Sequence, residues 1–229
     1  MSIISPSEVL VVIPARGGSK GIPKKNIKLV GGIPLVAWSI RASLNENKGY
    51  RTVVSTDDSE IAEISESFGA EVLKRPPEIA GDDSPTELTL IHAFESLKNV
   101  SPITHIVLLQ PTSPIRRPNI ISGALDQLEK EKADSLVGVL ELSPFLWRVV
   151  DEVNTPSYKV ASRKMRQNFL DSELVFLETG NIYITSSIAL SNSACRVSGI
   201  VSLFKVSRFE SLEIDTHEEL ELIDVILSK

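Results

Sequence analysis

The sequence is poor in cysteine, histidine and aromatic residues, and it contains no long apolar run. Its 229 residues include one cysteine, Cys195, which excludes an intrachain disulfide and a zinc site built from several cysteines. The apolar stretch at residues 9–13 is too short for a signal peptide or a membrane-spanning helix. We therefore expect a cytoplasmic protein that does not enter a membrane.

Acidic residues outnumber basic ones by 30 to 24, and the formal net charge is -6, so the composition does not favour a broad basic surface. All charged residues within 13–30 are nevertheless basic, namely Arg16, Lys20, Lys24, Lys25 and Lys28. One short cationic segment in an acidic chain indicates a receptor for a small anion, whereas nucleic-acid binding needs a wide basic face. We expect no nucleic-acid partner.

Apolar segments that suit buried strands alternate with amphipathic helices. Strands are predicted at residues 8–15, 51–57, 105–111, 135–142, 181–185 and 200–206. Helical faces are formed by apolar residues spaced three or four apart within 36–44, 61–68, 90–97 and 121–128. This alternation predicts an α/β fold with a doubly wound, mostly parallel sheet, whose ligand crevice lies beyond the carboxyl ends of the strands.

Residues 143–178 interrupt the alternation. They contain two prolines, a basic segment at 162–167 and no clear period, so we expect a protruding, hairpin-like arm within a single domain of residues 1–229. Near the end of the chain, Thr216 and Glu219 have the spacing of a capping box and predict the start of a final helix.

The cationic segment IPARGGSKGIPKKN lacks the glycine spacing of both a dinucleotide fingerprint and a P-loop. Its glycines, Gly17, Gly18 and Gly21, permit positive φ angles and a close approach of backbone N–H groups to an anion, while Arg16 and Lys20 supply countercharge. A polyphosphate would suit such a loop. The alternative is a solvated basic loop in which the glycines only turn the chain.

Five segments, in their order along the chain, resemble the cytidylyltransferases that activate acidic sugars, typified by CMP-N-acetylneuraminate synthetases and their legionaminate and pseudaminate relatives. They are IPARGGSKGIPKKN, STDDSEIAE, RPPEIAGDDSPT, QPTSPIR and EIDTHEELE. The resemblance covers about residues 9–142 and 179–227. It implies a Rossmann-like nucleotidyltransferase fold, CTP and an acidic sugar as substrates, and a homodimer formed through the arm.

The resemblance also implies the residues that bind the nucleotide: Ala15, Arg16, Gly17, Gly18, Lys20, Lys25, Asn26, Arg75 and Thr86. Arg16 and Lys20 would be catalytic as well, because fixed cations stabilise the charge that develops on the transferred phosphate and on pyrophosphate. We expect Lys24 and Lys28 to be solvated. For residues 75–86 the alternative is a proline-rich loop with a helix N-cap at Ser84 or Thr86.

The acceptor sugar would contact Gln110, Thr112 and Ser113, which directly follow a buried strand; the alternative is a turn enforced by the neighbouring prolines. Because the sugar carries a carboxylate, its site should also present arginine. By resemblance, the arm supplies Arg163, Arg166 and Gln167. Relatives tend to have an arginine where this chain has Leu177 and Glu178, which leaves open a sugar decorated differently from sialic acid.

Glu213 and Asp215 alternate along an extended segment and therefore point to one side. Two carboxylates at this spacing suit Mg²⁺, which prefers oxygen ligands and commonly bridges phosphates. Asp215 is the stronger ligand candidate and a predicted catalytic residue, although it could instead interact with the dipole of the helix that follows. Asp57 and Asp58 are expected to cap a helix.

The leading hypothesis is a cytidylyltransferase that uses Mg²⁺ to join CTP to an acidic nonulosonic sugar. Two alternatives remain at this point. The same fold could use another nucleotide or sugar, such as GTP, KDO or a sugar phosphate, or it could be a catalytically silent nucleotide-binding module.

Overall fold

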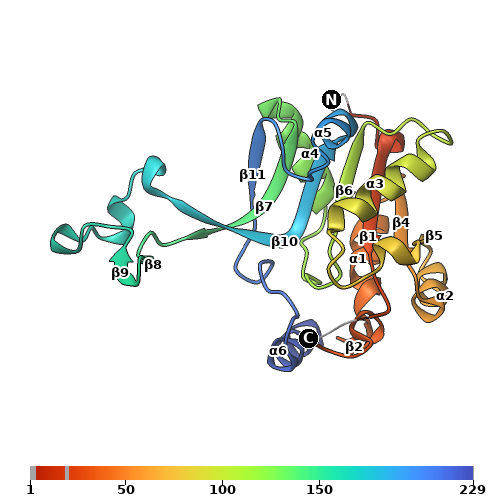
Figure 1. Ribbon diagram of the computed structural model, residues 1–229, viewed down its shortest axis with the longest axis horizontal. Helices are drawn as coiled ribbons and strands as arrows, with labels where there is room; N and C mark the ends of the chain where they lie inside the picture. The colour runs from red at the N-terminus through yellow and green to blue at the C-terminus, as the bar shows by residue number, and fades with distance from the viewer. Residues whose placement is uncertain (1–3, 19–20, 229) are drawn as a thin grey trace.

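The computed structural model describes residues 4–18 and 21–228 and has a central sheet with helices on both faces (Figure 1). The sheet has seven strands in the order β11-β7-β10-β6-β1-β4-β5. Their bounds are β1 Val9–Pro14, β4 Arg51–Thr56, β5 Glu71–Lys74, β6 His105–Leu108, β7 Ser135–Leu142, β10 Val175–Ser186 and β11 Val201–Lys205. Only β10 runs antiparallel to its neighbours in this sheet. The predicted α/β fold is confirmed.

Alternate residues of the central strands point to opposite faces of the sheet and pack into two separate hydrophobic cores. Val11 and Ile13 of β1 pack under α1 (Leu35–Leu44), α2 (Ser59–Ser67) and α4 (Ile120–Glu131), whereas Leu10 and Val12 face α3 (Thr86–Leu97) and α5 (Ser187–Ser193). Burial on both faces explains the continuous apolar runs of these strands. The helices thus form the outer layers of a three-layer sandwich.

A third, smaller core lies where the first part of the chain meets the last. Ile22 and Val30 pack there with Leu35, Ile214 and Ile223. Its elements are the short hairpin of β2 (Leu29–Val30) and β3 (Ile33–Pro34), and α6 (His217–Leu227), whose predicted capping box at Thr216 is present. This core holds the cationic segment next to the tail of the chain.

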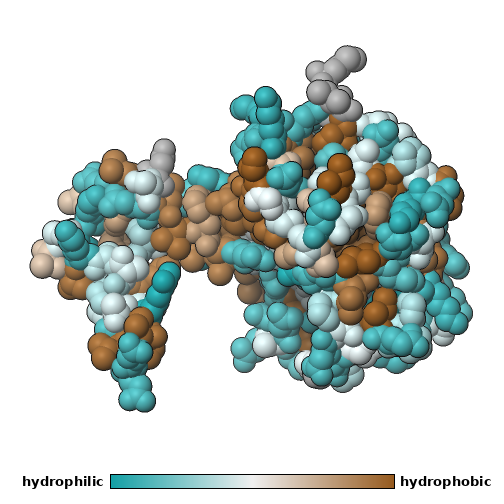
Figure 2. Space-filling model, turned by 45° about the horizontal axis from the view of Figure 1, so that its top comes forward, coloured by the Kyte–Doolittle hydropathy of each residue, from teal (hydrophilic) through white to brown (hydrophobic). Residues whose placement is uncertain are grey.

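The arm projects from one side of the body (Figure 1) and contains the antiparallel hairpin of β8 (Trp147–Val150) and β9 (Val153–Pro156). It is connected through β7 and β10, and the first residues of β10, at 175–178, pair with 139–142 of β7. Four residues expected in the arm therefore belong to the sheet. Apolar side chains cover this connection (Figure 2), and Leu177 is half exposed.

The pairing of β10 with β7 shifts register between Glu178 and Tyr183. This irregularity includes Gly180, which contacts residues of the pocket described below. Two short elements, β5 and α5, were not predicted from the sequence. In the described part of the chain, no helix is both long and apolar enough to cross a membrane.

Candidate active site

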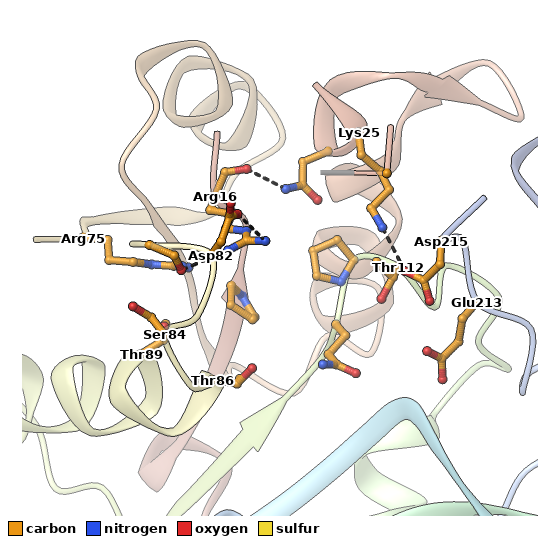
Figure 3. A pocket seen from close by; sticks show the side chains of 16 residues that line it. Arg16, Lys25, Arg75, Asp82, Ser84, Thr86, Thr89, Thr112, Glu213 and Asp215 are labelled. Carbon is orange, nitrogen blue, oxygen red and sulfur yellow. Dashed lines mark hydrogen bonds and ion pairs between the residues drawn. The ribbon is translucent and has the colours of Figure 1, made fainter. Parts of the chain in front are cut away.

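A pocket of about 610 Å³ opens beyond the carboxyl ends of β1 and β6 (Figure 3), at the crevice predicted for a doubly wound sheet. Its lining includes nine residues that the sequence singled out: Arg16, Lys25, Asn26, Arg75, Thr86, Gln110, Thr112, Glu213 and Asp215. Figure 3 shows two walls, one with Arg16, Asp82 and Thr86 and the other with Lys25, Asp215 and Glu213.

Arg16 is held at the first wall by two contacts to the segment before α3. Its Nη1 donates to the carbonyl oxygen of Gly81 at 2.9 Å, and its Nη2 lies 3.0 Å from Oδ1 of Asp82. Both side chains of this ion pair are partly exposed, at 28% and 40%. Asp82 was not predicted from the sequence, because a pairing across 66 positions leaves no local pattern.

The loop that carries Arg16 is fixed by side chains from other segments. Asn26 donates to the carbonyl oxygen of Arg16 at 2.9 Å, and the N–H of Gly17 donates to Oδ1 of Asp57 at 3.1 Å. A Cβ at Gly17 would lie 2.7 Å from Oδ2 of Asp58, so this glycine serves close packing. The φ angle of Gly17 is not positive, although a glycine at this position would permit it.

Three predicted loop residues, Ala15, Gly17 and Gly18, are outside the pocket lining. Ala15 is fully buried, and Gly18 is exposed. Lys20 lies outside the described residues. Lys24 is exposed and pairs with Glu60 at 2.6 Å, as expected for a surface lysine.

Arg75 is nearly fully buried at the first wall. It donates from Nη2 to the carbonyl oxygen of Ser55 at 2.6 Å and from Nε to the Ser55 hydroxyl at 3.2 Å. Burial lowers the pKa of Arg75; the nearby Asp57 carboxylate opposes this shift and the Arg16 cation adds to it. Its planar guanidinium is therefore held rigidly beside the pocket.

Helix α3 brings Thr86 and Thr89 to the same wall. The expectation that Ser84 or Thr86 caps this helix is wrong, because Pro85 occupies the N-cap and has no side-chain acceptor. Thr86 is the first helical residue, and Ser84 lines the pocket. Asp58 does cap α2, by accepting from the N–H of Ile61 at 3.0 Å.

The second wall joins the cationic segment to the tail. Lys25 Nζ donates to the carbonyl oxygen of Ile214 at 2.7 Å and to Oδ1 of Asp215 at 3.0 Å. A Cβ at Gly21 would lie 2.7 Å from the backbone oxygen of Asp215, so the two backbones touch there. The N–H of Ile214 also donates to the carbonyl oxygen of Thr112 at 2.8 Å.

Gly180 contacts two residues of the pocket lining, and its N–H donates to Oε1 of one of them, Glu213, at 2.6 Å. A Cβ here would collide with Oε1 of Gln110 and lie 2.9 Å from the Ser113 hydroxyl. The hydroxyl of Ser113 is buried and has no hydrogen-bond partner among the described residues. Side-chain atoms of Gln110, Ser113 and Glu213 therefore converge on the backbone of Gly180, and a larger residue there would displace them.

Arg116 is partly buried and supports the segments that carry Gln110 and Gly180. It donates to the carbonyl oxygens of Asn181 and Gln110 at 2.9 and 2.8 Å and to the hydroxyl of Ser39 at 2.9 Å. Burial lowers its pKa to about 9. Arg116 belongs to the QPTSPIR motif, but the sequence did not reveal that it connects α1, β10 and the loop after β6.

Arg163 and Gln167, two of the arm residues predicted to bind the acceptor, do not line this pocket. Arg163 stacks 4.2 Å from the ring centroid of Phe145 and lines a different cavity, of about 480 Å³, within the arm. Gln167 donates to the sulfur of Met165 at 3.4 Å. The side chain of Arg166 lies outside the described part of the structure.

Glu213 and Asp215 are the residues that could hold a divalent cation. Each has one oxygen engaged, by the Gly180 N–H and by Lys25 respectively. Their remaining oxygens are hard ligands that suit Mg²⁺, with phosphates and water completing its coordination. Within residues 4–18 and 21–228, no group of three or more His, Cys, Asp or Glu residues is arranged to hold a metal by itself.

The chain was compared with known proteins. N-acylneuraminate cytidylyltransferase A of Danio rerio is 38% identical over 144 residues, which cover 63% of this chain and 33% of the relative. CMP-N,N'-diacetyllegionaminic acid synthase of Legionella pneumophila is 31% identical over 224 residues, or 96% of both chains. The chain thus spans between a third and a half of the length of the fish relatives it matches, and nearly all of the bacterial relative.

The fold has a close counterpart among solved structures. CMP:2-keto-3-deoxy-manno-octonic acid synthetase complexed with CTP superimposes with a TM-score of 0.72 at 18% identity, covering 97% of this chain and 99% of that one. The model of the family described as Cytidylyltransferase matches residues 10–184. The chain belongs to the cytidylyltransferase family.

Proposed function

We propose that the chain transfers the cytidylyl group of CTP to an acidic nonulosonic sugar and releases pyrophosphate. The observation that carries this proposal is the contact between Lys25 and Asp215, 190 positions apart, in a pocket that also contains Arg16. Cations and carboxylates that face one cleft suit a triphosphate bound with Mg²⁺. The names of the relatives support the acidic sugar as acceptor.

In this reaction the anomeric hydroxyl of the sugar attacks the α-phosphorus of CTP. A sugar–phosphorus bond forms, the bond from the α-phosphorus to its bridging oxygen breaks, and the hydroxyl proton passes to solvent. Arg16 and Lys25 would bind the negative phosphates, and Lys20 is proposed to do the same on the basis of the sequence. The protein acts mainly by positioning both substrates and neutralising their charge.

We propose Mg²⁺ as the cofactor, with Asp215 as its principal ligand and Glu213 as a second. When bound, Mg²⁺ would neutralise charge on the phosphates that accumulates as pyrophosphate departs. Asp215 suits this role because its side chain is 66% exposed and, among the described residues, only one of its carboxylate oxygens has a partner, Lys25.

We also propose that the protein forms a homodimer through the arm. Trp147, Val149 and Val153 on its hairpin are 59%, 73% and 62% exposed, and such apolar residues favour a partner surface. Arg163 and Gln167 lie away from the pocket of their own chain, so in this proposal they act on the acceptor in the pocket of the partner copy. A cytoplasmic location is part of the proposal, since a single cysteine gives no sign of an oxidising compartment.

The test measures pyrophosphate release and product mass. Purified protein is incubated with Mg²⁺, one of CTP, GTP, UTP or ATP, and a panel of nonulosonic acids, KDO and sugar phosphates. Activity with CTP and a nonulosonic acid is expected, and it should be lost in Asp215→Asn but retained in Glu218→Gln, which removes a nearby exposed charge. Turnover only with another nucleotide or sugar, or nucleotide binding without any turnover, would overturn the proposal.

A further inference from the structure

The wall of the pocket formed by α3 depends on a helix start that has no side-chain cap. The N-cap is Pro85, whereas α2, α5 and α6 are capped by the side chains of Asp58, Ser186 and Thr216. Thr86 and Thr89 from the first turn of α3 line the pocket. Because no side-chain cap orders this turn, a side-chain contact from another segment can help to hold it in place.

That contact is an ion pair between Glu87 and Arg196. Nη1 of Arg196 lies 2.8 Å from Oε1 of Glu87, and the two residues are 109 positions apart in sequence. Both side chains are largely shielded, with 24% and 21% exposure. Glu87 lies next to Thr86, so the pair acts on the helical turn that faces the pocket.

Arg196 is itself held by β10. Its guanidinium lies 4.7 Å from the ring centroid of Tyr183, and the Tyr183 hydroxyl donates to Oε1 of Glu178 at 2.8 Å. Burial and the Glu178 carboxylate raise the pKa of Tyr183, while Arg196 opposes the shift. The tyrosine therefore stays neutral and provides a fixed aromatic face for the guanidinium.

The loop around Arg196 is ordered by local hydrogen bonds. The N–H of Cys195 donates to the Ser193 hydroxyl oxygen at 3.1 Å, and Sγ of Cys195 contacts the carbonyl oxygen of Val197 at 3.2 Å. A side chain with a fixed loop on one side and a fixed ring on the other loses little freedom when it pairs with Glu87.

We propose that Arg196 is a positioning residue for the nucleotide pocket. Through Glu87 it fixes the first turn of α3 and keeps Thr86 and Thr89 at the pocket wall, and through Tyr183 it connects that wall to β10 at the base of the arm. This inference rests on the proposed use of the pocket by CTP. It assigns a role to a segment that the sequence analysis left without one.

The test compares Arg196→Met and Arg196→Lys with Arg51→Met. The control removes another Arg–Glu pair, Arg51 with Glu71 at 2.7 Å, at the opposite end of β4 from the pocket. Arg196→Met should weaken CTP binding in calorimetry and raise the KM for CTP about fivefold with kcat unchanged, as expected for loss of uniform binding. Arg196→Lys should recover part of the affinity, and Arg51→Met should leave it unchanged.

A double-mutant cycle adds a second measurement. Arg196→Met with Glu87→Gln should bind CTP no more weakly than either single variant, because both remove the same contact. Unchanged CTP affinity in Arg196→Met overturns the inference. So does a selective rise in the KM for the acceptor, which would mean that Arg196 contacts the sugar. Failure of the wild-type protein to bind CTP would instead refute the proposed function.

Discussion

The ion pair between Arg16 and Asp82 leads to a prediction of unusual sign, namely that removing an acidic pocket residue tightens CTP binding. When Arg16 binds the triphosphate, its ion pair with Asp82 must weaken. The negative phosphates also repel the Asp82 carboxylate. Asp82→Asn removes the charge and keeps the shape. Nη1 of Arg16 still donates to the carbonyl oxygen of Gly81 at 2.9 Å, so the guanidinium should remain oriented.

The magnitude follows from the geometry of the pair. At 3.0 Å the Coulomb energy is about 1.4 kcal/mol in the dielectric of water. The pair is partly exposed, and such pairs contribute only about 0.2–1 kcal/mol in measurements. Asp82→Asn should therefore lower the Kd for CTP by a factor of roughly 1.4 to 5. The gain should shrink at high salt, where both interactions are screened.

Titration calorimetry with CTP and Mg²⁺ measures this change. The matched control is Glu60→Gln, which also removes one negative charge from an ion pair, in this case with Lys24 at 2.6 Å outside the pocket. If Glu60→Gln tightens binding as much as Asp82→Asn, the effect is one of net charge alone. If Asp82→Asn weakens binding, Asp82 supports the nucleotide and the reasoning is refuted.

Three further changes test the supports of the pocket. Gly180→Ala should lower kcat/KM by displacing Gln110, whereas Gly123→Ala, where a Cβ has room in α4, should not; steady-state kinetics decides. Arg116→Met should reduce the free energy of unfolding by about 3–5 kcal/mol in urea titrations, because it leaves three partly buried acceptors unpaired. Hydrogen bonds from the backbone N–H groups of residues 215 and 216 lower the pKa of Glu219 from its ordinary value of 4.5. The ionised carboxylate therefore stabilises the folded protein above that pH, and this contribution is lost as the pH falls through the folded pKa. In melting curves, the difference in stability between the wild type and Glu219→Gln should accordingly become smaller below about pH 4.5.

The layers of the fold could be predicted from the sequence because their signals are local. The apolar run of β1, the helical spacing of α4 and the capping box at Thr216 all lie within a few residues and need no partner to be recognised. The direction of β10 could not be predicted in this way, because a buried strand has the same composition in either orientation. The four residues of β5 form an edge strand with no distinctive pattern.

The site divides along the same line. Arg16, Lys25 and Asp215 were predicted from motifs that resemble those of the family, and the fold brings all three to one pocket. Asp82 and Arg196 were missed because each acts through a partner far along the chain. Arg163 was predicted from an arm motif, yet in a single chain its guanidinium stacks on Phe145, away from the pocket.

The pocket combines residues held by several hydrogen bonds with cations whose ion-pair partners can be exchanged. This difference indicates how the pocket can admit a ligand. Arg116 connects Ser39, Gln110 and Asn181 through three partly buried hydrogen bonds, and a Cβ at Gly180 would collide with Gln110. The cations Arg16 and Lys25, by contrast, are paired with the partly exposed carboxylates of Asp82 and Asp215. Phosphates can replace these carboxylates by side-chain movement alone, because exposed ion pairs contribute little. We therefore expect CTP binding to exchange ion-pair partners at the walls while the segments connected by Arg116 stay in place.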